Sequence, residues 1–346
     1  MSGRSHYHVL QVLPTADQRV IEAAYKALIR QYHPDVAPGN TDLTIRINEA
    51  YSVLSDPKRR ADYDTTLEGL TNDLLGGRYR VLRKIASGGF GTTYLAEHAE
   101  LPGSLVCIKH AARISPQFED ILTKEAQAMW DLRHHAIPPI RDYLRLEDGS
   151  VAMVMGYIEG PTLQSLVDDK GPIDPEDVAW IAERVLNALM YLHINGVVHG
   201  DLKPLNVIVQ EAGHHVYVVD FGLASVRPTT ADGSIGYTPY FGPPEAKRGM
   251  PLLPQSDLYS LGATMIYALT GDIRAVDAKE VPDSVPPEMT AFMRRLMRRS
   301  PLDRPDWQAE DLMDSFAEIR QKDFGRPRSG MRPIRHLRPA TGKVTA

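Results

Sequence analysis

Two segments of the chain carry residues that could handle a polyphosphate. The glycine-rich stretch 86–91 lies between two strand-like runs, where its backbone N–H groups could face phosphate oxygens. Lys109 ends a strand-like run eighteen residues after Gly91, and its ammonium could reach the same oxygens. Each feature alone has an ordinary explanation, because a glycine turn can simply tighten a hairpin and a lysine at a strand end is usually solvated.

Acidic and amide side chains follow in an order that fits the same chemistry. Glu125 lies in a helical pattern and could pair with Lys109. Residues 199–206 read His-Gly-Asp-Leu-Lys-Pro-Leu-Asn, and residues 220–222 read Asp-Phe-Gly. Chance agreement of all these pieces in this order and spacing is very small.

The hydrophobic periodicity predicts the elements that must position these residues. Short β-branched runs predict strands, and longer helical patterns follow them. The strands are expected at 81–85, 92–96, 105–109, 151–155 and 216–219, and two of the helices at 175–194 and 258–269. A strand-rich part therefore precedes a helix-rich part, which is an α+β arrangement.

Residues 78–320 resemble a eukaryotic-type protein kinase domain. The matching pieces are the glycine-rich loop, Lys109, Glu125, the loop 199–206, Asp-Phe-Gly at 220–222, Pro243-Pro244-Glu245, Asp257 in SDLYSLG and Arg304 in SPLDRP. The resemblance implies a bilobal fold with a β-rich N-lobe and an α-rich C-lobe. It also implies an ATP- and Mg²⁺-dependent enzyme that phosphorylates serine or threonine hydroxyls of proteins.

The family's residue roles carry over to matching positions of this sequence. Lys109, steered by Glu125, would hold the α- and β-phosphates, and Asn206 and Asp220 would bind Mg²⁺. Asp201 would accept or orient the proton of the substrate hydroxyl. Lys203 would stabilise the γ-phosphate, and with Thr238 it matches the serine/threonine form of the family. The ATP pocket would be lined by Ile85, Ala86, Ser87, Gly88, Gly89, Phe90, Gly91, Thr93, Cys107, Lys109, Met155 and Tyr157.

Three further positions are expected to be structural. Glu245 and Arg304 should form a buried pair that anchors the activation segment, and Asp257 is likewise expected to have a structural role.

The lone Cys107 is expected either to be a small buried hydrophobe or to mark the nucleotide pocket. If it marks the pocket, ATP should slow its alkylation.

Several positions depart from the family pattern. Ala86 replaces the first glycine of the loop, Thr93 replaces a valine, and Gly156 stands where glutamate is common. Gly200 replaces the arginine before Asp201, so no guanidinium is available there for a phosphorylated activation loop. Switching by activation-loop phosphorylation is therefore not favoured. A catalytically inactive pseudokinase that serves only as a scaffold remains the alternative.

The N-terminal segment has a different pattern. Helical patterns at 15–32 and 42–54 predict a hairpin, and its loop contains His33-Pro34-Asp35. The segment resembles a small all-α J-domain of the DnaJ type. The resemblance implies that His33, Pro34 and Asp35, with Lys26 and Arg30 on the basic helix face, bind a DnaK-type heat-shock chaperone and stimulate its ATPase. A solvated helix face is the ordinary alternative for the two basic residues. If the kinase fold is an inactive pseudokinase scaffold, the whole chain would act as a J-domain co-chaperone.

The net charge of −5 averages over unlike segments of the 346 residues. Residues 1–70 carry a net −1, residues 71–319 carry −11 and residues 320–346 carry +7. We expect a J-domain at 5–65, a linker at 66–77, a kinase domain at 78–320 and a basic, disordered tail at 321–346. The tail lacks the aromatic residues that stack bases, so nucleic-acid binding is not predicted.

The sequence also indicates a compartment. A single cysteine cannot form an internal disulfide, and the first residues lack the apolar run of a secretory signal. No stretch approaches the length of apolar chain that crosses a bilayer. These features predict a cytoplasmic protein without a membrane span.

Overall fold

The computed structural model describes residues 6–10, 12, 16–32, 41–60, 63, 74–88, 91–111, 116–210, 214–229, 232–234 and 236–325. The chain divides into two compact units. One comprises Met1–Glu119 with Asp142–Val154, and the other comprises Asp120–Arg141 with Met155–Ala346. The predicted site residues His33, Pro34, Asp35, Gly89 and Phe90, and the tail from 326 onward, lie outside the described residues.

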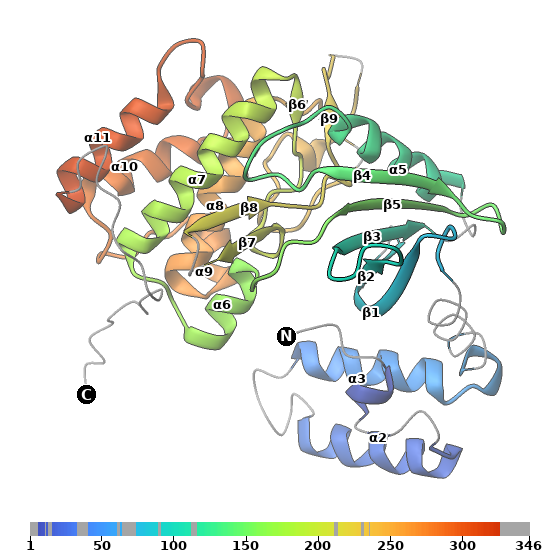
Figure 1. Cartoon of the computed structure of the whole chain (residues 1–346). Coiled ribbons are helices and arrows are strands. Elements are labelled where there is room, and N and C mark those ends of the chain that lie inside the picture. The colour runs from blue at the N-terminus through green and yellow to red at the C-terminus, as the bar shows by residue number, and fades with distance from the viewer. Residues whose placement is uncertain are drawn as a thin grey trace. The chain divides into compact units, whose positions relative to one another are not determined.

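The N-terminal part of the first unit is helical. It contains α1 (His6–Val9), α2 (Gln18–Tyr32) and α3 (Thr41–Leu54), and α2 and α3 lie side by side (Figure 1). Apolar side chains from these helices form one core of Leu10, Ile21, Leu28, Ile47, Ala50 and Leu54. Helix α2 begins three residues later than predicted, because the Asp17 carboxylate accepts from the N–H groups of Arg19 (2.8 Å) and Val20 (3.1 Å) and so caps it.

The same unit contains a five-stranded antiparallel sheet in the order β1-β2-β3-β5-β4 (Figure 1). Its strands are β1 (Tyr79–Gly88), β2 (Gly91–His98), β3 (Leu105–Ala111), β4 (Ile140–Arg145) and β5 (Val151–Gly156). The β-branched runs predict four of these strands, and each extends beyond the predicted range. Val81, Ala96, Ile108 and Val154 are buried in the core on one face of the sheet.

The second unit is mostly helical, and α5 links the two units in sequence. Its helices are α5 (Pro116–Met129), α6 (Leu163–Lys170), α7 (Pro175–Ile194), α8 (Pro254–Thr270), α9 (Ile273–Ala278), α10 (Pro287–Leu296) and α11 (Leu312–Phe324). Short 3₁₀ helices cover Pro204–Asn206, Ala246–Arg248 and Pro301–Asp303. Short strands form the pairs β6 (Val197–Val198) with β9 (Ser225–Val226), and β7 (Val207–Gln210) with β8 (His215–Val218).

The predicted α+β order is confirmed, with differences at element ends. Helix α7 has the predicted bounds because Asp174 caps it and Pro175 occupies its first turn. Helix α8 begins at Pro254, four residues before the predicted start. Helix α11 continues to Phe324, so the first residues assigned to the tail are helical. Among the described residues, no helix is both long and apolar enough to span a bilayer.

Candidate active site

Two side chains of the second unit converge on the carboxylate of Asp201. The Lys203 ammonium donates to Asp201 Oδ2 at 2.6 Å, and the Thr238 hydroxyl donates to Asp201 Oδ1 at 2.5 Å. Lys203 also donates to Thr238 Oγ1 at 2.9 Å. Only 10% of the Asp201 side chain is exposed, so both of its oxygens are held in fixed directions.

A buried carboxylate holds the backbone just before Asp201. Asp257 accepts from the N–H groups of His199 and Gly200, both at 2.8 Å. It also pairs with His193 Nε2 at 2.8 Å. These contacts tie residues 199–206, the expected catalytic loop, to helix α8, which is among the most deeply buried helices of this unit.

The hydrogen bonds also fix the tautomer of the His193 imidazole. The indole N–H of Trp307 donates to His193 Nδ1 at 2.8 Å. Because an indole N–H can only donate, Nδ1 accepts, and the imidazole proton lies on Nε2, where it faces Asp257. Burial alone would raise the pKa of Asp257, but the hydrogen bonds from His193 and Gly200 outweigh it and lower that pKa.

Gly200 has a structural reason to lack a side chain. Its φ is +78°, and a Cβ there would lie 2.4 Å from the carbonyl oxygen of Leu223. The catalytic loop therefore packs directly on the backbone after Asp-Phe-Gly. Any side chain at this position, arginine included, would meet that carbonyl oxygen.

Asn206 and Asp220 are joined through the backbone. The Val219 N–H donates to the Asn206 carbonyl oxygen at 2.9 Å, and Asn206 Nδ2 donates to the Asp201 carbonyl oxygen at 2.9 Å. The Asn206 amide nitrogen is therefore used in a contact within the protein, while the amide oxygen Oδ1 keeps its capacity to accept or to bind a metal ion. Asp220 is exposed and has a left-handed backbone with φ of +65°.

This donor set fits Mg²⁺ held together with a nucleotide. Mg²⁺ prefers oxygen ligands and is usually bound by one or two protein groups plus substrate phosphates. Asp220 and Asn206 supply such oxygens. Within the described part of the chain, no group of three or more His, Cys, Asp or Glu residues could hold a metal ion by itself.

Glu125 is bound to the Asp-Phe-Gly segment. Its side chain is buried in α5, and Oε1 accepts from the Phe221 N–H at 3.0 Å. The sequence predicted only a pairing with Lys109, and that pairing stays a prediction. The contact with Phe221 was missed because it joins a side chain to a backbone group far away in the sequence.

The glycine-rich segment belongs to the first unit. Gly88 pairs with Gly91 across the β1–β2 hairpin, Ala86 pairs with Thr93, and Thr93 pairs with Lys109 of β3. A Cβ on Gly91 would lie 2.3 Å from the carbonyl oxygen of His110. Gly91 is therefore required by sheet packing as well as by any phosphate.

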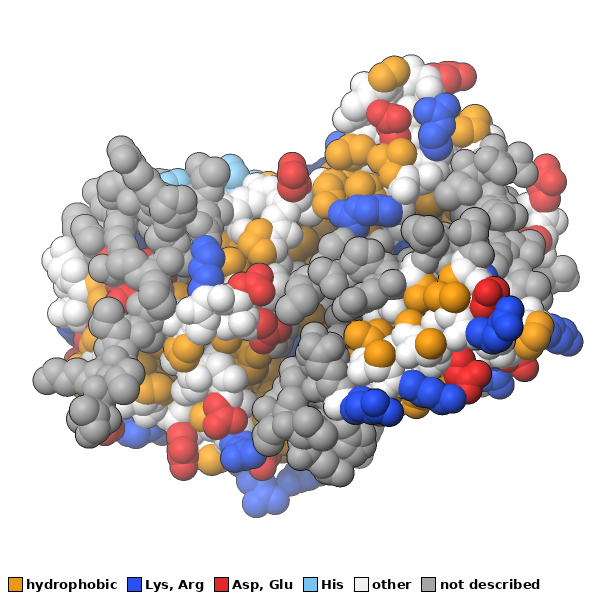
Figure 2. Space-filling view, turned by 90° about the horizontal axis from the view of Figure 1, so that it is seen from below, with side chains coloured by type: hydrophobic (Ala, Val, Ile, Leu, Met, Phe, Trp, Pro, Cys, Tyr) orange, Lys and Arg blue, Asp and Glu red, His pale blue; other side chains and the backbone are white. Residues whose placement is uncertain are grey.

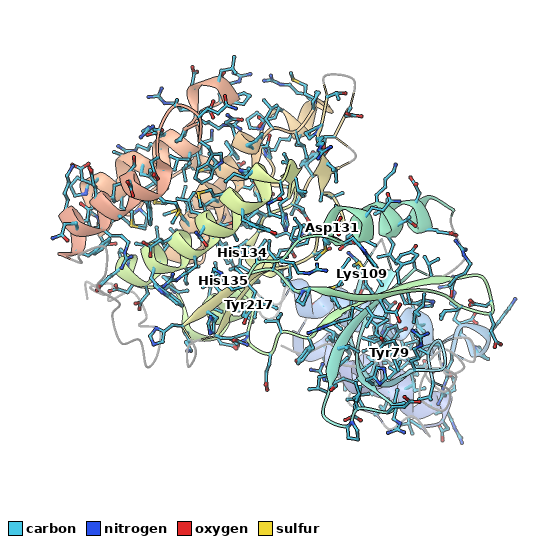
Figure 3. All side chains as sticks on the ribbon, turned by 45° about the horizontal axis from the view of Figure 1, so that its top comes forward. Tyr79, Lys109, Asp131, His134, His135 and Tyr217 are labelled. Carbon is cyan, nitrogen blue, oxygen red and sulfur yellow. The ribbon has the colours of Figure 1, made fainter. Side chains whose placement is uncertain are left out.

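The other predicted nucleotide residues lie on or beside the sheet. Lys109 is on β3, in the same sheet as Tyr79 (Figure 3). Ile85 and Cys107 are half-buried on β1 and β3, Met155 is 8% exposed at the end of β5, and half-buried Tyr157 follows that strand.

The expected anchor pair is present. Arg304 forms two hydrogen bonds with the Glu245 carboxylate, Nη1 to Oε1 at 2.6 Å and Nη2 to Oε2 at 2.8 Å. Ser256 also donates to Glu245 Oε1 at 2.8 Å. Burial alone would raise the pKa of Glu245, but the hydrogen bonds and charge of Arg304 outweigh it and lower that pKa.

The sequence comparisons agree with this arrangement. The family model for the protein kinase domain matches residues 79–316, and the model for the DnaJ domain matches residues 5–64. The chain belongs to the protein kinase family. Its kinase domain thus carries the catalytic loop, Asp-Phe-Gly and the buried anchor pair in one matched region.

Bacterial serine/threonine kinases are among the relatives. The chain is 33% identical over 205 residues to serine/threonine-protein kinase PrkC of Bacillus subtilis, covering 58% of this chain and 31% of the relative. It is 31% identical over 224 residues to serine/threonine-protein kinase F of Synechocystis, covering 57% and 45%. The chain therefore spans less than half of the length of these relatives.

The described part of the DnaJ domain shows a basic surface. The Lys26 side chain is 67% exposed and pairs with Glu22 at 2.6 Å, and Arg30 is also exposed. Lys and Arg side chains reach the surface there beside hydrophobic ones (Figure 2). Tyr25 stacks on Tyr51 with ring centres 3.8 Å apart, which holds α2 and α3 together beneath this surface.

The kinase domain also uses residues that sequence reasoning missed. His193 and Trp307 complete the network around Asp257, although they lie 114 positions apart. A histidine in the mostly apolar last two turns of helix α7 was the available signal. Its partners could not be read from the sequence, because they come from α8 and from the loop before α11.

Proposed function

We propose that the chain is an active serine/threonine protein kinase that uses ATP and Mg²⁺. The observation that carries the proposal is the hydrogen-bonded group of Asp201, Lys203 and Thr238. Asp201 would orient a substrate hydroxyl, which offers the same kind of donor that Thr238 now gives to Oδ1. Lys203 lies within reach to balance charge on the transferred phosphoryl group.

Other residues would hold the Mg²⁺ and the nucleotide. Asn206 and Asp220 would hold Mg²⁺, which supplies charge neutralisation on the phosphate oxygens when bound. Lys109 and the glycine-rich loop would hold the nucleotide phosphates. Glu125 would fix the Asp-Phe-Gly segment through the Phe221 N–H, so that the Asp220 carboxylate keeps its direction.

Phosphate incorporation tests this proposal. The purified full chain is incubated with γ-labelled ATP and Mg²⁺ and compared with Asp201→Asn and Asp220→Ala. We expect label on serine or threonine in the wild type, and a loss of at least about a hundredfold in both variants. No incorporation by a folded, ATP-binding wild type would favour the pseudokinase scaffold.

We also propose that the DnaJ domain recruits a DnaK-type chaperone and stimulates its ATPase. The exposed basic face of α2, with Lys26 and Arg30, supports docking to an acidic surface. His33→Gln should abolish the stimulation, and Lys26→Glu with Arg30→Glu should weaken it and reduce its salt dependence. Unchanged stimulation by His33→Gln would refute the assignment.

A further inference from the structure

A cavity of about 360 Å³ opens in the second unit, and one of its lining residues, Tyr240, follows Thr238 by two positions. Four basic residues line it, Lys247, Arg248, Lys279 and Arg299, together with the rings of Tyr240 and Tyr259. This volume lies within the roughly 300–1,000 Å³ range of ligand pockets. The cavity is separate from the residues assigned above to ATP and Mg²⁺.

The charge in this cavity is poorly balanced. Among its lining residues only Asp277 is acidic, and no carboxylate forms an ion pair with any of the four cations in the described part of the chain. The nearby Arg304 is already paired with Glu245. Residues 71–319 carry a net −11, so this cationic cavity has the opposite sign to the region around it.

Lys279 is held in place at the cavity wall. Its ammonium donates to the Met297 carbonyl oxygen at 3.0 Å and lies 5.0 Å from the centre of the Tyr259 ring. Burial lowers the pKa of Lys279, and the charges of Arg304, Lys247 and Arg299 lower it further. A bound anion would relieve this repulsion.

Two lining residues have a backbone conformation that non-glycine residues rarely adopt. Lys279 has φ of +56° and Tyr240 has φ of +71°. Such conformations are costly for bulky residues and cluster at binding sites, where the surroundings hold them. For Lys279 this conformation is the C-cap of α9, where its N–H donates to the carbonyl oxygens of Ala275 and Val276, so the end of the helix sets where this side chain begins. Tyr240 has no helix cap to explain its conformation.

The cavity is also close to the catalytic residues along the chain. Tyr240 follows Thr238 by two residues, so their Cα atoms lie within about 7 Å of each other. Thr238 donates directly to Asp201. A group bound in the cavity would therefore belong to a segment near the accepting hydroxyl.

We propose that this cavity binds the phosphate of a phosphoserine or phosphothreonine on the protein substrate, so that the kinase prefers substrates already phosphorylated near the accepting residue. A phosphate monoester carries about −1.5 to −2 charges and three acceptor oxygens, so it suits a cavity lined by four cations better than a single carboxylate does. Nucleic acid is less favoured, because it requires a basic stripe along the backbone and this is one concave site. The proposal rests on the proposed kinase activity for its effect on catalysis, but not for binding.

Binding is measured first, by fluorescence anisotropy of labelled peptides with the full chain. One peptide carries phosphoserine between alanines and glycines, and matched peptides carry serine or glutamate. We expect the phosphoserine peptide to bind best and to lose at least about tenfold affinity in Arg248→Glu/Arg299→Glu. The control Arg274→Glu/Arg294→Glu changes two exposed arginines outside the cavity and should keep wild-type affinity.

Other outcomes would overturn the proposal. Equal affinity for phosphoserine and serine peptides, or an equal loss in the control variant, would show that the cavity does not recognise phosphate. Tighter binding of single-stranded DNA that the cavity variant abolishes would make it a nucleic-acid site. If the peptide binds only after the protein has been treated with phosphatase, a phosphorylated residue of this chain, and not of a substrate, occupies the cavity. If the double variant melts at a lower temperature, Arg299→Ala replaces it.

Phosphotransfer supplies the second measurement. The cavity variant should raise the KM for a phosphorylated peptide and leave the rate on its unphosphorylated counterpart unchanged. Equal effects on both peptides would contradict the proposal. If the wild type transfers no phosphate to any peptide, the proposed kinase activity is wrong. The anisotropy measurement still tests whether the cavity binds a phosphorylated peptide.

Discussion

The catalytic loop and the basic face of α2 both present charged groups, but they depend on the rest of the chain differently. The backbone before Asp201 is held by a buried carboxylate on a distant helix. Lys26 and Arg30 are presented by the helix that contains them, and the Lys26 contact lies one helical turn away. Substitutions beneath the catalytic loop should therefore change stability and activity together, whereas substitutions on α2 should change only binding.

The largest expected effect comes from Asp257. In Asp257→Ala, two backbone N–H groups and His193 lose their shared acceptor in a buried site, which should cost about 4 kcal/mol of unfolding free energy. Urea unfolding measures this loss. The control Asp283→Ala removes an exposed carboxylate and should change the free energy by less than about 0.5 kcal/mol. Equal losses in the two variants would mean that the network is not structural.

The same carboxylate predicts a pH dependence. Because its folded-state pKa is lowered, Asp257 stabilises the fold above its unfolded pKa of about 3.9, and this contribution is lost as pH falls through the folded value. The stability difference between the wild type and Asp257→Asn should stay constant above about pH 5 and shrink below about pH 4. A difference that grows on acidification would contradict the assigned direction.

Glu245→Gln should have the next largest effect. The substitution leaves the buried Arg304 guanidinium without a carboxylate but with one amide acceptor, so we expect a loss of about 3 kcal/mol. Thermal or urea unfolding measures it. A neutral result would show that the backbone carbonyl oxygens of Gln255, Arg298 and Arg299, which already accept from Arg304, are sufficient to satisfy the guanidinium.

Gly200→Ala tests the close approach of the catalytic loop to Leu223. The new Cβ meets a carbonyl oxygen in a left-handed conformation, and we expect a loss of about 2 kcal/mol with reduced phosphotransfer. Gly103 is a matched control, because its φ is +84° and no atom lies within 4 Å of a Cβ built there. Gly103→Ala should cost only the backbone strain, about 1 kcal/mol. Equal costs would remove the steric explanation for the missing arginine.

The smallest stability effect is expected on the DnaJ domain. Lys26→Ala breaks an exposed pair with Glu22 and should leave the melting temperature unchanged, while chaperone ATPase stimulation falls. Unfolding followed by circular dichroism, beside the ATPase assay, separates the two effects. A clear drop in melting temperature would show that the basic face also supports the fold.

The same contrast explains what the sequence could predict. Patterns local to one segment predicted α7 and the β-branched strands, because capping and hydrophobic periodicity act over a few residues. Short motifs predicted Asp201, Lys203 and the pairing of Glu245 with Arg304. The roles of His193 and Trp307 in the Asp257 network, and the contact of Glu125 with Phe221, depend on elements far apart in the chain. The cationic cavity could not be predicted from the sequence for the same reason, because its residues come from several separate elements.

We propose that one chain carries two separable activities, phosphotransfer and stimulation of a chaperone ATPase. The most direct measurement assays phosphotransfer and chaperone ATPase stimulation side by side in the wild type, Asp201→Asn and His33→Gln. We expect Asp201→Asn to lose only phosphotransfer and His33→Gln to lose only stimulation. Wild-type phosphotransfer on serine or threonine by Asp201→Asn, or loss of both activities in either variant while it remains folded, would contradict two separable activities.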